Sequence, residues 1–120
     1  MLEKIEGLPD NVVGIVGKGE VTRDDYRNVL EPAVSAALER HSKVRMLYVL
    51  GDEVTGISPG AMWEDGKVGF EHLSRWERMA VVTDKEWIRH TINAFNWLVP
   101  GQIRTFTVAQ RDEARAWISG

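Results

Sequence analysis

The chain has 120 residues, which suffices for one hydrophobic core but not for two, so we expect a single domain over residues 1–120. Its formal net charge of −3 disfavours a nucleic-acid partner, because such a partner requires Lys and Arg clustered on one face. The absence of cysteine excludes disulfides, thiolate catalysis and cysteine-based zinc sites.

The N-terminal residues do not have the composition of a targeting segment. The stretch MLEKIEGLPDNVVGIVGKG mixes acids with apolar residues and lacks a basic segment followed by a long apolar core. No apolar run approaches the roughly 18 residues that a membrane span needs. We therefore expect no signal peptide, no integral membrane segment and a cytoplasmic location.

The first part of the chain indicates an antiparallel hairpin. MLEKIEGLP is loosely alternating, and the turn-like residues 9–11 lead into the Val- and Ile-rich NVVGIVGKGEV. Glycines at 14, 17 and 19 indicate a bulge in preference to a close approach by a ligand. Their order, G-x-x-G-x-G, is not the dinucleotide fingerprint, and we predict no cofactor.

A helix and a buried strand follow the hairpin. Thr22 begins the helix, since its hydroxyl can cap the amides of RDD, and apolar residues then recur at three and four. Pro32 lies inside this pattern and lacks an amide hydrogen, so the helix should kink there or restart as a second segment. VRMLYVLG is a continuous apolar run from Val44 to Leu50, which predicts a strand buried on both faces.

A second helix is predicted to start at Ser58 and Pro59, as a cap followed by proline at the first helical position. It should run through GAMWEDGKVGFEHLSRW. We expect an irregular first half, because Gly66 and Gly69 each weaken a helix by about 1 kcal/mol relative to alanine.

The remaining elements continue the alternation. RMAVVTD is a strand, and TDKE, from Thr83 to Glu86, has the pattern of a capping box for the helix KEWIRHTINAFNWLV. IRTFTVA is the last strand and RDEARAWI the last helix. Alternating strands and helices predict right-handed crossovers. The predicted fold class is a single α/β domain with about five strands, mostly parallel apart from the N-terminal antiparallel hairpin, covered by about four helices.

Several segments of this chain resemble one known family. AMWED, FEHLSRWERMAVVTD, EWI, IRTFTVAQRDEA and ARAWI are similar to the SpoIIAA-like family, which is related to STAS domains and to the lipid-binding CRAL-TRIO fold. The resemblance implies the fold above and a binding or regulatory role. STAS anti-sigma antagonists carry a phosphorylatable serine in an Asp-Ser pair, but GDEVTGISPG has no such pair. Ser58 is the nearest hydroxyl, and a helix cap is its favoured role.

The candidate site is the stretch GDEVTGISPGAMWED, residues 51–65, and the helix that follows it. It gathers carboxylates, hydroxyls and a tryptophan between a buried strand and a helix start, where α/β proteins tend to place their sites. It contains no catalytic spacing, and we predict no catalytic residue. We expect the segment 55–63 and the glycine-rich second strand to border a cleft for a small apolar ligand or a regulatory protein. The candidate ligand-binding residues are Thr55, Ser58, Met62, Trp63, Asp65 and His72.

The acids and histidines of this region have other interpretations. Solvated or capping roles are favoured for Asp52, Glu53 and Glu64, whereas Asp65 matches the family's Trp-x-Asp position and is a candidate structural anchor. His72 is able to line a pocket, although a structural role is favoured. The three histidines lie on separate predicted helices without ligand spacing, so no metal site is predicted.

The third predicted helix has more apolar surface than one sheet contact requires. Trp87, Ala94 and Trp97 form one row beside a second row of Ile88, Ile92 and Phe95. Packing against a neighbouring helix explains the surplus, and a symmetric dimer interface is the next explanation. The functional hypothesis is a non-enzymatic binding or regulatory module. A phosphorylation-responsive regulator working through Ser58 or Thr55 is the alternative, and a small hydrolase ranks third.

Overall fold

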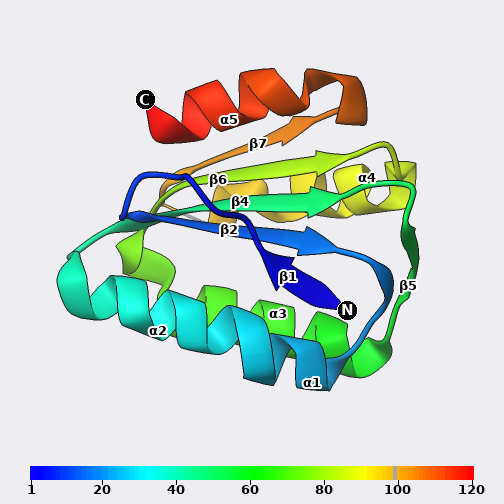
Figure 1. Ribbon diagram of the computed structural model, residues 1–120, viewed down its shortest axis with the longest axis horizontal. Helices are drawn as coiled ribbons and strands as arrows, with labels where there is room; N and C mark the ends of the chain where they lie inside the picture. Colours follow the sequence, from blue (N-terminus) through cyan, green and yellow to red (C-terminus); the bar gives the residue numbers. More distant parts are fainter. Residues whose placement is uncertain (99) are drawn as a thin grey trace.

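The fold is built on a five-stranded sheet in the order β1-β2-β4-β6-β7. A computed structural model describes residues 1–98 and 100–120, apart from the side chains of Phe95 and Leu98. The strands are β1 (Leu2–Lys4), β2 (Val12–Gly17), β4 (Val44–Leu50), β6 (Trp76–Thr83) and β7 (Gln102–Phe106). β1 is antiparallel to β2, and the other neighbouring pairs are parallel. The predicted α/β class with its N-terminal hairpin is confirmed (Figure 1).

A small second sheet pairs β3 (Gly19–Val21) with β5 (Val54–Ile57) in parallel. The predicted second strand over residues 11–21 is therefore interrupted, because Gly19 has a φ of +59°, a left-handed conformation that glycine tolerates. The register also shifts between Gly19 and Glu20, which is the irregularity expected of glycine here. The segment between β4 and Ser58, for which the sequence predicts no strand, contains the short strand β5.

The first helical region has three parts: α1 (Arg23–Asp25), the π-helical turn η1 (Tyr26–Leu30) and α2 (Glu31–Arg40). Thr22 caps it as predicted, since its hydroxyl accepts from the Asp25 amide and its own amide donates to the Asp25 carboxylate. The Glu31 amide bonds to the Tyr26 carbonyl five residues back, which accommodates Pro32 in the first turn of α2. The predicted restart at this proline is confirmed.

Three more helices follow: α3 (Pro59–Glu71), α4 (Glu86–Phe95) and α5 (Arg111–Ser119), with short 3-10 turns η2 (Leu73–Arg75), η3 (Asn96–Leu98) and η4 (Val108–Gln110). α3 is regular throughout, so the expected irregularity in its first half is wrong. It also ends earlier than predicted, because Trp76 is buried and begins β6. Helical structure after β6 continues to residue 98, and the predicted end of that helix at Val99 lies outside the described residues.

The predicted capping box at Thr83–Glu86 is wrong. Thr83 is the last residue of β6 and is completely buried, and its hydroxyl accepts from the Lys85 amide at 3.1 Å. α4 begins at Glu86, after Lys85, without a side-chain cap. The burial of the strand end holds the threonine in the sheet and moves the helix start beyond its reach.

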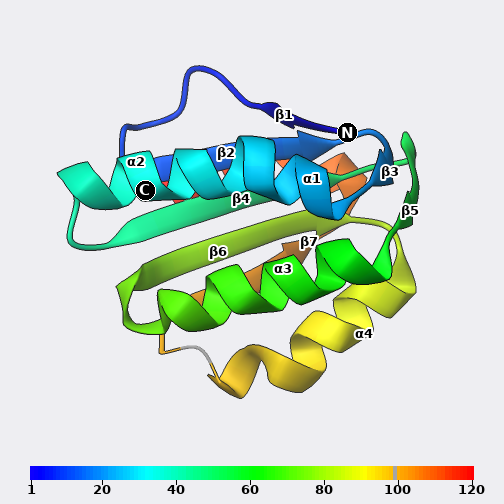
Figure 2. The same cartoon turned by 90° about the horizontal axis from the view of Figure 1, so that it is seen from below.

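The sheet is covered on both faces (Figures 1 and 2). α1–α2, α3 and α4 lie on one face, and α5 lies on the other. Side chains of β4 alternate between the two faces. Met46, Tyr48 and Leu50 join the core on the face covered by α2, α3 and α4, whereas Leu47 and Val49 join the core beneath α5. β4 is thus buried on both faces, as its apolar run predicts. Within the described ranges, no helix has the length and apolarity needed to cross a membrane.

Candidate functional site

An open cavity of about 430 Å³ lies between α3 and α4 above the sheet, and we call it the α3–α4 cavity. Its existence follows from the side chains that α3 lacks on this side. Gly66 and Gly69 lie one turn apart and both line the cavity, and a Cβ at either position would meet no atom within 4 Å. The two glycines leave space that larger side chains would occupy.

The lining of the cavity is predominantly apolar. The sheet supplies Met46, Tyr48, Leu50, Met79, Val81 and Ile103, α3 supplies Met62, Asp65, Val68 and Phe70, and α4 supplies Trp87, Ile88, Thr91 and Ile92. Met62 and Trp87 are 48% and 49% exposed and lie at the rim. The arrangement is an apolar chamber that opens to solvent between two helices.

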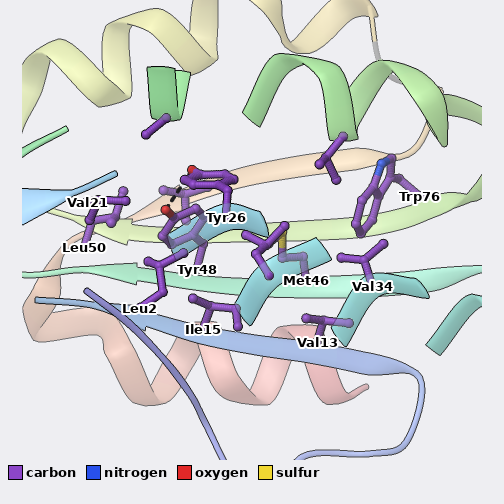
Figure 3. Close-up of a cluster of buried hydrophobic side chains, with 14 of the residues drawn as sticks. Leu2, Val13, Ile15, Val21, Tyr26, Val34, Met46, Tyr48, Leu50 and Trp76 are labelled. Atoms are coloured by element: carbon purple, nitrogen blue, oxygen red, sulfur yellow. Dashed lines mark hydrogen bonds between the residues drawn. The ribbon is translucent and has the colours of Figure 1, made fainter. Parts of the chain in front are cut away.

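One end of the cavity is polar. Tyr26 from η1, Tyr48 from β4 and Asp65 from α3 form a hydrogen-bonded chain there. The Tyr26 hydroxyl donates to Asp65 Oδ1 at 3.0 Å. It lies 2.8 Å from the Tyr48 hydroxyl (Figure 3). The two tyrosine rings, 6.4 Å apart, belong to the buried core and fix the position of the carboxylate.

The protonation of this chain follows from its surroundings. Burial raises the pKa of both tyrosines, so both remain protonated. Asp65 is an exposed residue at the open cavity, but desolvation by the groups packed around it raises the pKa of its carboxyl, and the hydrogen bond from Tyr26 opposes that rise only in part. The carboxylate opens onto the cavity but is surrounded by apolar side chains, and no Lys, Arg or His is among the described residues that line it.

Trp76 marks the other end of the cavity. Val44 pairs with Trp76 across the sheet and Tyr48 pairs with Val81, so the two ends lie five positions apart along β6. At about 3.3 Å per residue this is a span of roughly 16 Å. Figure 3 shows Met46 between Tyr48 and Trp76. The chamber is therefore elongated along the strands.

Two of the predicted site residues, Met62 and Asp65, line this cavity. Thr55 is exposed on β5, and Trp63 is 68% exposed on α3. The Ser58 hydroxyl accepts from the Ala61 amide at 3.1 Å and caps α3, which is the role the sequence favours. The cavity lies away from β2, where a cleft is predicted, and ligand binding by Thr55, Ser58 and Trp63 stays a prediction.

His72 ends α3 and is half-buried beside a second, smaller hollow of about 260 Å³ between α2 and α3. Glu31, Ser35, Lys67 and Glu71 also line this polar hollow. The sequence suggests that His72 is able to line a pocket, and the structure places it at this one rather than with Asp65. A ligand-binding role for His72 stays a prediction.

The solvated role predicted for Glu64 is wrong, because this residue is only 2% exposed. Its Oε1 lies 3.4 Å from Arg27 Nη2 and 3.6 Å from Arg23 Nε. Burial raises the pKa of Glu64, but a hydrogen bond with Glu31 and the charges of Arg27, Lys67 and Arg23 outweigh it and hold the pKa below its usual value. Glu64 and Asp65, adjacent on α3, thus face an ion-pair network and the apolar cavity respectively.

The predicted interface residues are accessible. Trp97 is 75% exposed, its indole nitrogen donating to the Ala94 carbonyl at 3.1 Å, and Ala94 is exposed. Trp87 lies at the cavity rim, and the Phe95 side chain of the second row lies outside the described residues. Packing of Trp97 against a neighbouring helix, the first explanation for its apolar surface, is therefore wrong. A dimer interface stays a prediction.

Sequence reasoning missed the two tyrosines and the role of the glycines. Tyr26 and Tyr48 were expected only as members of apolar stripes, yet a buried tyrosine needs a hydrogen-bond partner for its hydroxyl, and that need is a usable signal. Gly66 and Gly69 share one helix face with Met62, Asp65 and Leu73 at helical spacing. An apolar helix face interrupted by glycine is the signal for the cavity.

Comparison with known proteins agrees with this architecture. A solved structure of an uncharacterized protein of the DUF3478 family with a SpoIIAA-like fold, from Shewanella loihica PV-4, is 23% identical in sequence. The match covers 98% of this chain and 92% of that one, with a TM-score of 0.73. At this identity the likeness shows the fold alone. No curated protein matches the chain significantly.

The family model described as SpoIIAA-like matches residues 12–119, which is nearly the whole chain and includes every residue of the cavity. The resemblance seen in the sequence and the architecture of the structure agree with this match. The chain belongs to the SpoIIAA-like family.

Proposed function

We propose that this protein is a non-enzymatic binding module that holds a small, elongated and mainly apolar ligand in the α3–α4 cavity. The observation that carries the proposal is the cavity itself, whose volume of about 430 Å³ lies in the range of small-molecule sites. Its apolar lining with one hydrogen-bonded polar end is the composition expected for a ligand with an apolar body and one polar group.

The side chains in the cavity support binding rather than catalysis. Apart from the indole N–H groups of Trp76 and Trp87, its polar side chains among the described residues are Asp65, Tyr26, Tyr48 and Thr91. Tyr26 donates to the Asp65 carboxylate, but burial raises the pKa of both tyrosines and so disfavours a phenolate nucleophile. Thr91 donates to the Trp87 carbonyl at 2.8 Å and has no base as its partner. The site offers a mainly apolar surface and one carboxylate, Asp65, that can bind the polar group of a ligand.

A pair of substitutions at one glycine tests the proposal. Gly69→Leu places a branched side chain in the open space beside the cavity, whereas Gly69→Ala adds one methyl group and a similar gain in helix propensity. Binding of 1-octanol to the unmodified protein and to both variants is measured by titration calorimetry, with native mass spectrometry to detect co-purified molecules. We expect Gly69→Leu to weaken 1-octanol binding about tenfold or more and Gly69→Ala to change it less than about twofold.

The alanine variant is the matched control, because any effect of helix stability on binding appears in both variants. Equal 1-octanol affinity in Gly69→Leu and Gly69→Ala would place the binding elsewhere on the molecule and contradict the proposal. Failure of the unmodified protein to bind 1-octanol, together with a spectrum free of co-purified molecules, would do the same. Should Gly69→Leu fail to fold, Gly66→Leu tests the same space from the neighbouring turn.

A further inference from the structure

The hydroxyl groups of Tyr26, Tyr48 and Thr91 each donate their proton to another group of the protein. Tyr26 has one hydroxyl proton, which it donates to Asp65 Oδ1 at 3.0 Å. Its 2.8 Å contact with Tyr48 must therefore use the Tyr48 proton. Thr91 donates its proton to the Trp87 carbonyl at 2.8 Å. The hydroxyl and carboxylate oxygens thus present hydrogen-bond acceptors to a ligand and no donor.

The charge at the polar end of the cavity also favours a ligand group that donates hydrogen bonds. Asp65 is the only acidic side chain among the described residues that line the cavity, and no basic side chain accompanies it there. Asp65 is exposed at the open cavity, so its carboxylate is accessible to a ligand whose apolar body lies against the neighbouring lining. A ligand group that carries positive charge and donates hydrogen bonds supplies what this end of the cavity lacks, whereas an anion would lie against Asp65 without a compensating cation.

We propose that the α3–α4 cavity selects amphiphiles whose polar end is a cationic hydrogen-bond donor of the primary-amine class, bound through an ion pair with Asp65. This inference rests on the proposed function, because it assigns the head group of the ligand held there. The apolar tail extends along the sheet toward Trp76, over the roughly 16 Å between the two ends. The ammonium bonds to the carboxylate, and Tyr26 and Tyr48 hold that carboxylate in place.

Three probes with one tail and different heads test the inference. Octylamine, 1-octanol and octanoate are titrated separately into the unmodified protein near neutral pH, where the first is a cation and the last an anion. A charge-assisted hydrogen bond in an apolar site is stronger than a neutral one, so octylamine should bind about tenfold or more tightly than 1-octanol. Octanoate should bind more weakly than 1-octanol.

Two charge-matched substitutions locate the effect. Asp65→Asn keeps an oxygen that accepts from Tyr26 but removes the negative charge, so octylamine should bind as weakly as 1-octanol does and 1-octanol binding should change less than about twofold. Glu71→Gln removes the same charge from an exposed carboxylate of α3 that pairs with Lys67 and does not line the cavity. This control variant should keep the preference for octylamine.

The outcomes separate the inference from the proposed function. If 1-octanol binds and Gly69→Leu weakens it, but octanoate binds as tightly as octylamine, the head-group assignment is overturned and the proposed function stands. Unchanged octylamine binding in Asp65→Asn overturns the assignment as well. If none of the three probes binds, both proposals fail. Should Asp65→Asn not fold, the comparison of the three probes on the unmodified protein decides alone.

Discussion

Two glutamates between α2 and α3, Glu31 and Glu64, form a carboxyl pair whose pKa values are shifted in opposite directions. Burial and the hydrogen bond with Glu64 raise the pKa of Glu31, whereas the neighbouring cations hold the pKa of Glu64 below its usual value. Oε2 of Glu64 is buried and has no hydrogen-bond partner among the described residues. Burial and the interaction with Glu64 favour the protonated form of Glu31, so Glu31 keeps its proton to a higher pH than an ordinary glutamate.

This pair makes stability depend on pH in a predictable direction. A folded-state pKa above the unfolded value means that the contribution of Glu31 is complete below the unfolded pKa and is lost as pH rises through the folded pKa. Glu31→Gln supplies a permanent N–H donor and cannot ionise. We expect the free energy of unfolding of this variant, relative to the unmodified protein, to increase as pH rises from about 4, near the pKa of an unfolded glutamate, through the raised folded-state pKa of Glu31.

Urea unfolding at several pH values measures the difference. Glu39→Gln is the control, since it removes the same charge from an exposed position of the same helix. A pH dependence that is identical in the two variants would show that the Glu31–Glu64 contact does not hold the proton. Because Glu64 has the opposite shift, its own contribution is present above the unfolded pKa and is lost as pH falls through the lowered value.

Residue-level prediction from sequence succeeded where a side chain acts locally. Thr22 and Ser58 cap helices as predicted, because a cap needs only the amides of the next turn. The roles of Glu64 and Asp65 were harder to predict, because the residues around them come from η1, α2 and β4, which are distant in sequence. Asp65 was selected on a family resemblance, whereas its chemistry depends on Tyr26, 39 residues away.

Among the helices, α4 buries few apolar side chains against the rest of the molecule. Ile88 is its one buried side chain among those described, Ile92 is half-buried, and the remainder of its apolar surface faces the cavity or solvent. Helices that bury few apolar side chains open at a lower free energy than the core. The element that forms one wall of the cavity is therefore the one best able to move.

Hydrogen exchange of backbone amides tests this property. We expect the amides of α4 to exchange at least about tenfold faster than those of β4, whose residues are almost all buried, because α4 opens without global unfolding. Saturation with octylamine should slow exchange in α4 and leave the amides of α5, on the opposite face of the sheet, unchanged. Equal protection of α4 and β4 in the free protein would contradict this picture.

Elements were predictable from sequence when their pattern was long and consistent. β4 and β6 were found because strands buried on both faces are continuous apolar runs. β3 and β5 are only three and four residues long, and their pairing depends on two segments far apart in the chain. The regularity of α3 was missed because packing outweighs the helix propensity of two glycines.

At the scale of the whole molecule, the exposed apolar side chains of α3, α4 and the turn η3 that follows α4 bear on self-association. Trp97 and Phe70 are 75% and 72% exposed, and burying a tryptophan contributes about 2 to 3 kcal/mol at roughly 25 cal/mol per Å². A two-fold contact uses each such residue twice. We expect a symmetric dimer that uses α4 or the neighbourhood of Trp63.

Sedimentation at micromolar concentration should give about twice the monomer mass, and Trp97→Glu should shift the protein to monomer. Trp87 needs separate treatment, because it also lines the cavity and its substitution would change ligand binding. Arg111→Glu on α5, an exposed position on the opposite face of the sheet, is the control for a change of charge and should leave the mass unchanged. A monomeric unmodified protein would rule out the dimer.

The position of α5 has a consequence for the chain as it is being synthesised. The strands of the main sheet are added in chain order, and the face covered by α2, α3 and α4 can close before α5 exists. The other face carries Val12, Leu47, Val49, Ala80 and Val82, which α5 covers through Ala114 and Ile118, with Ile5 and Leu8 packing against the same cluster. At roughly 5 to 20 residues per second, the nine residues of α5 take about 0.5 to 2 s to emerge. During that interval most of this apolar face of the sheet is exposed to water. Such a surface binds chaperones and promotes aggregation.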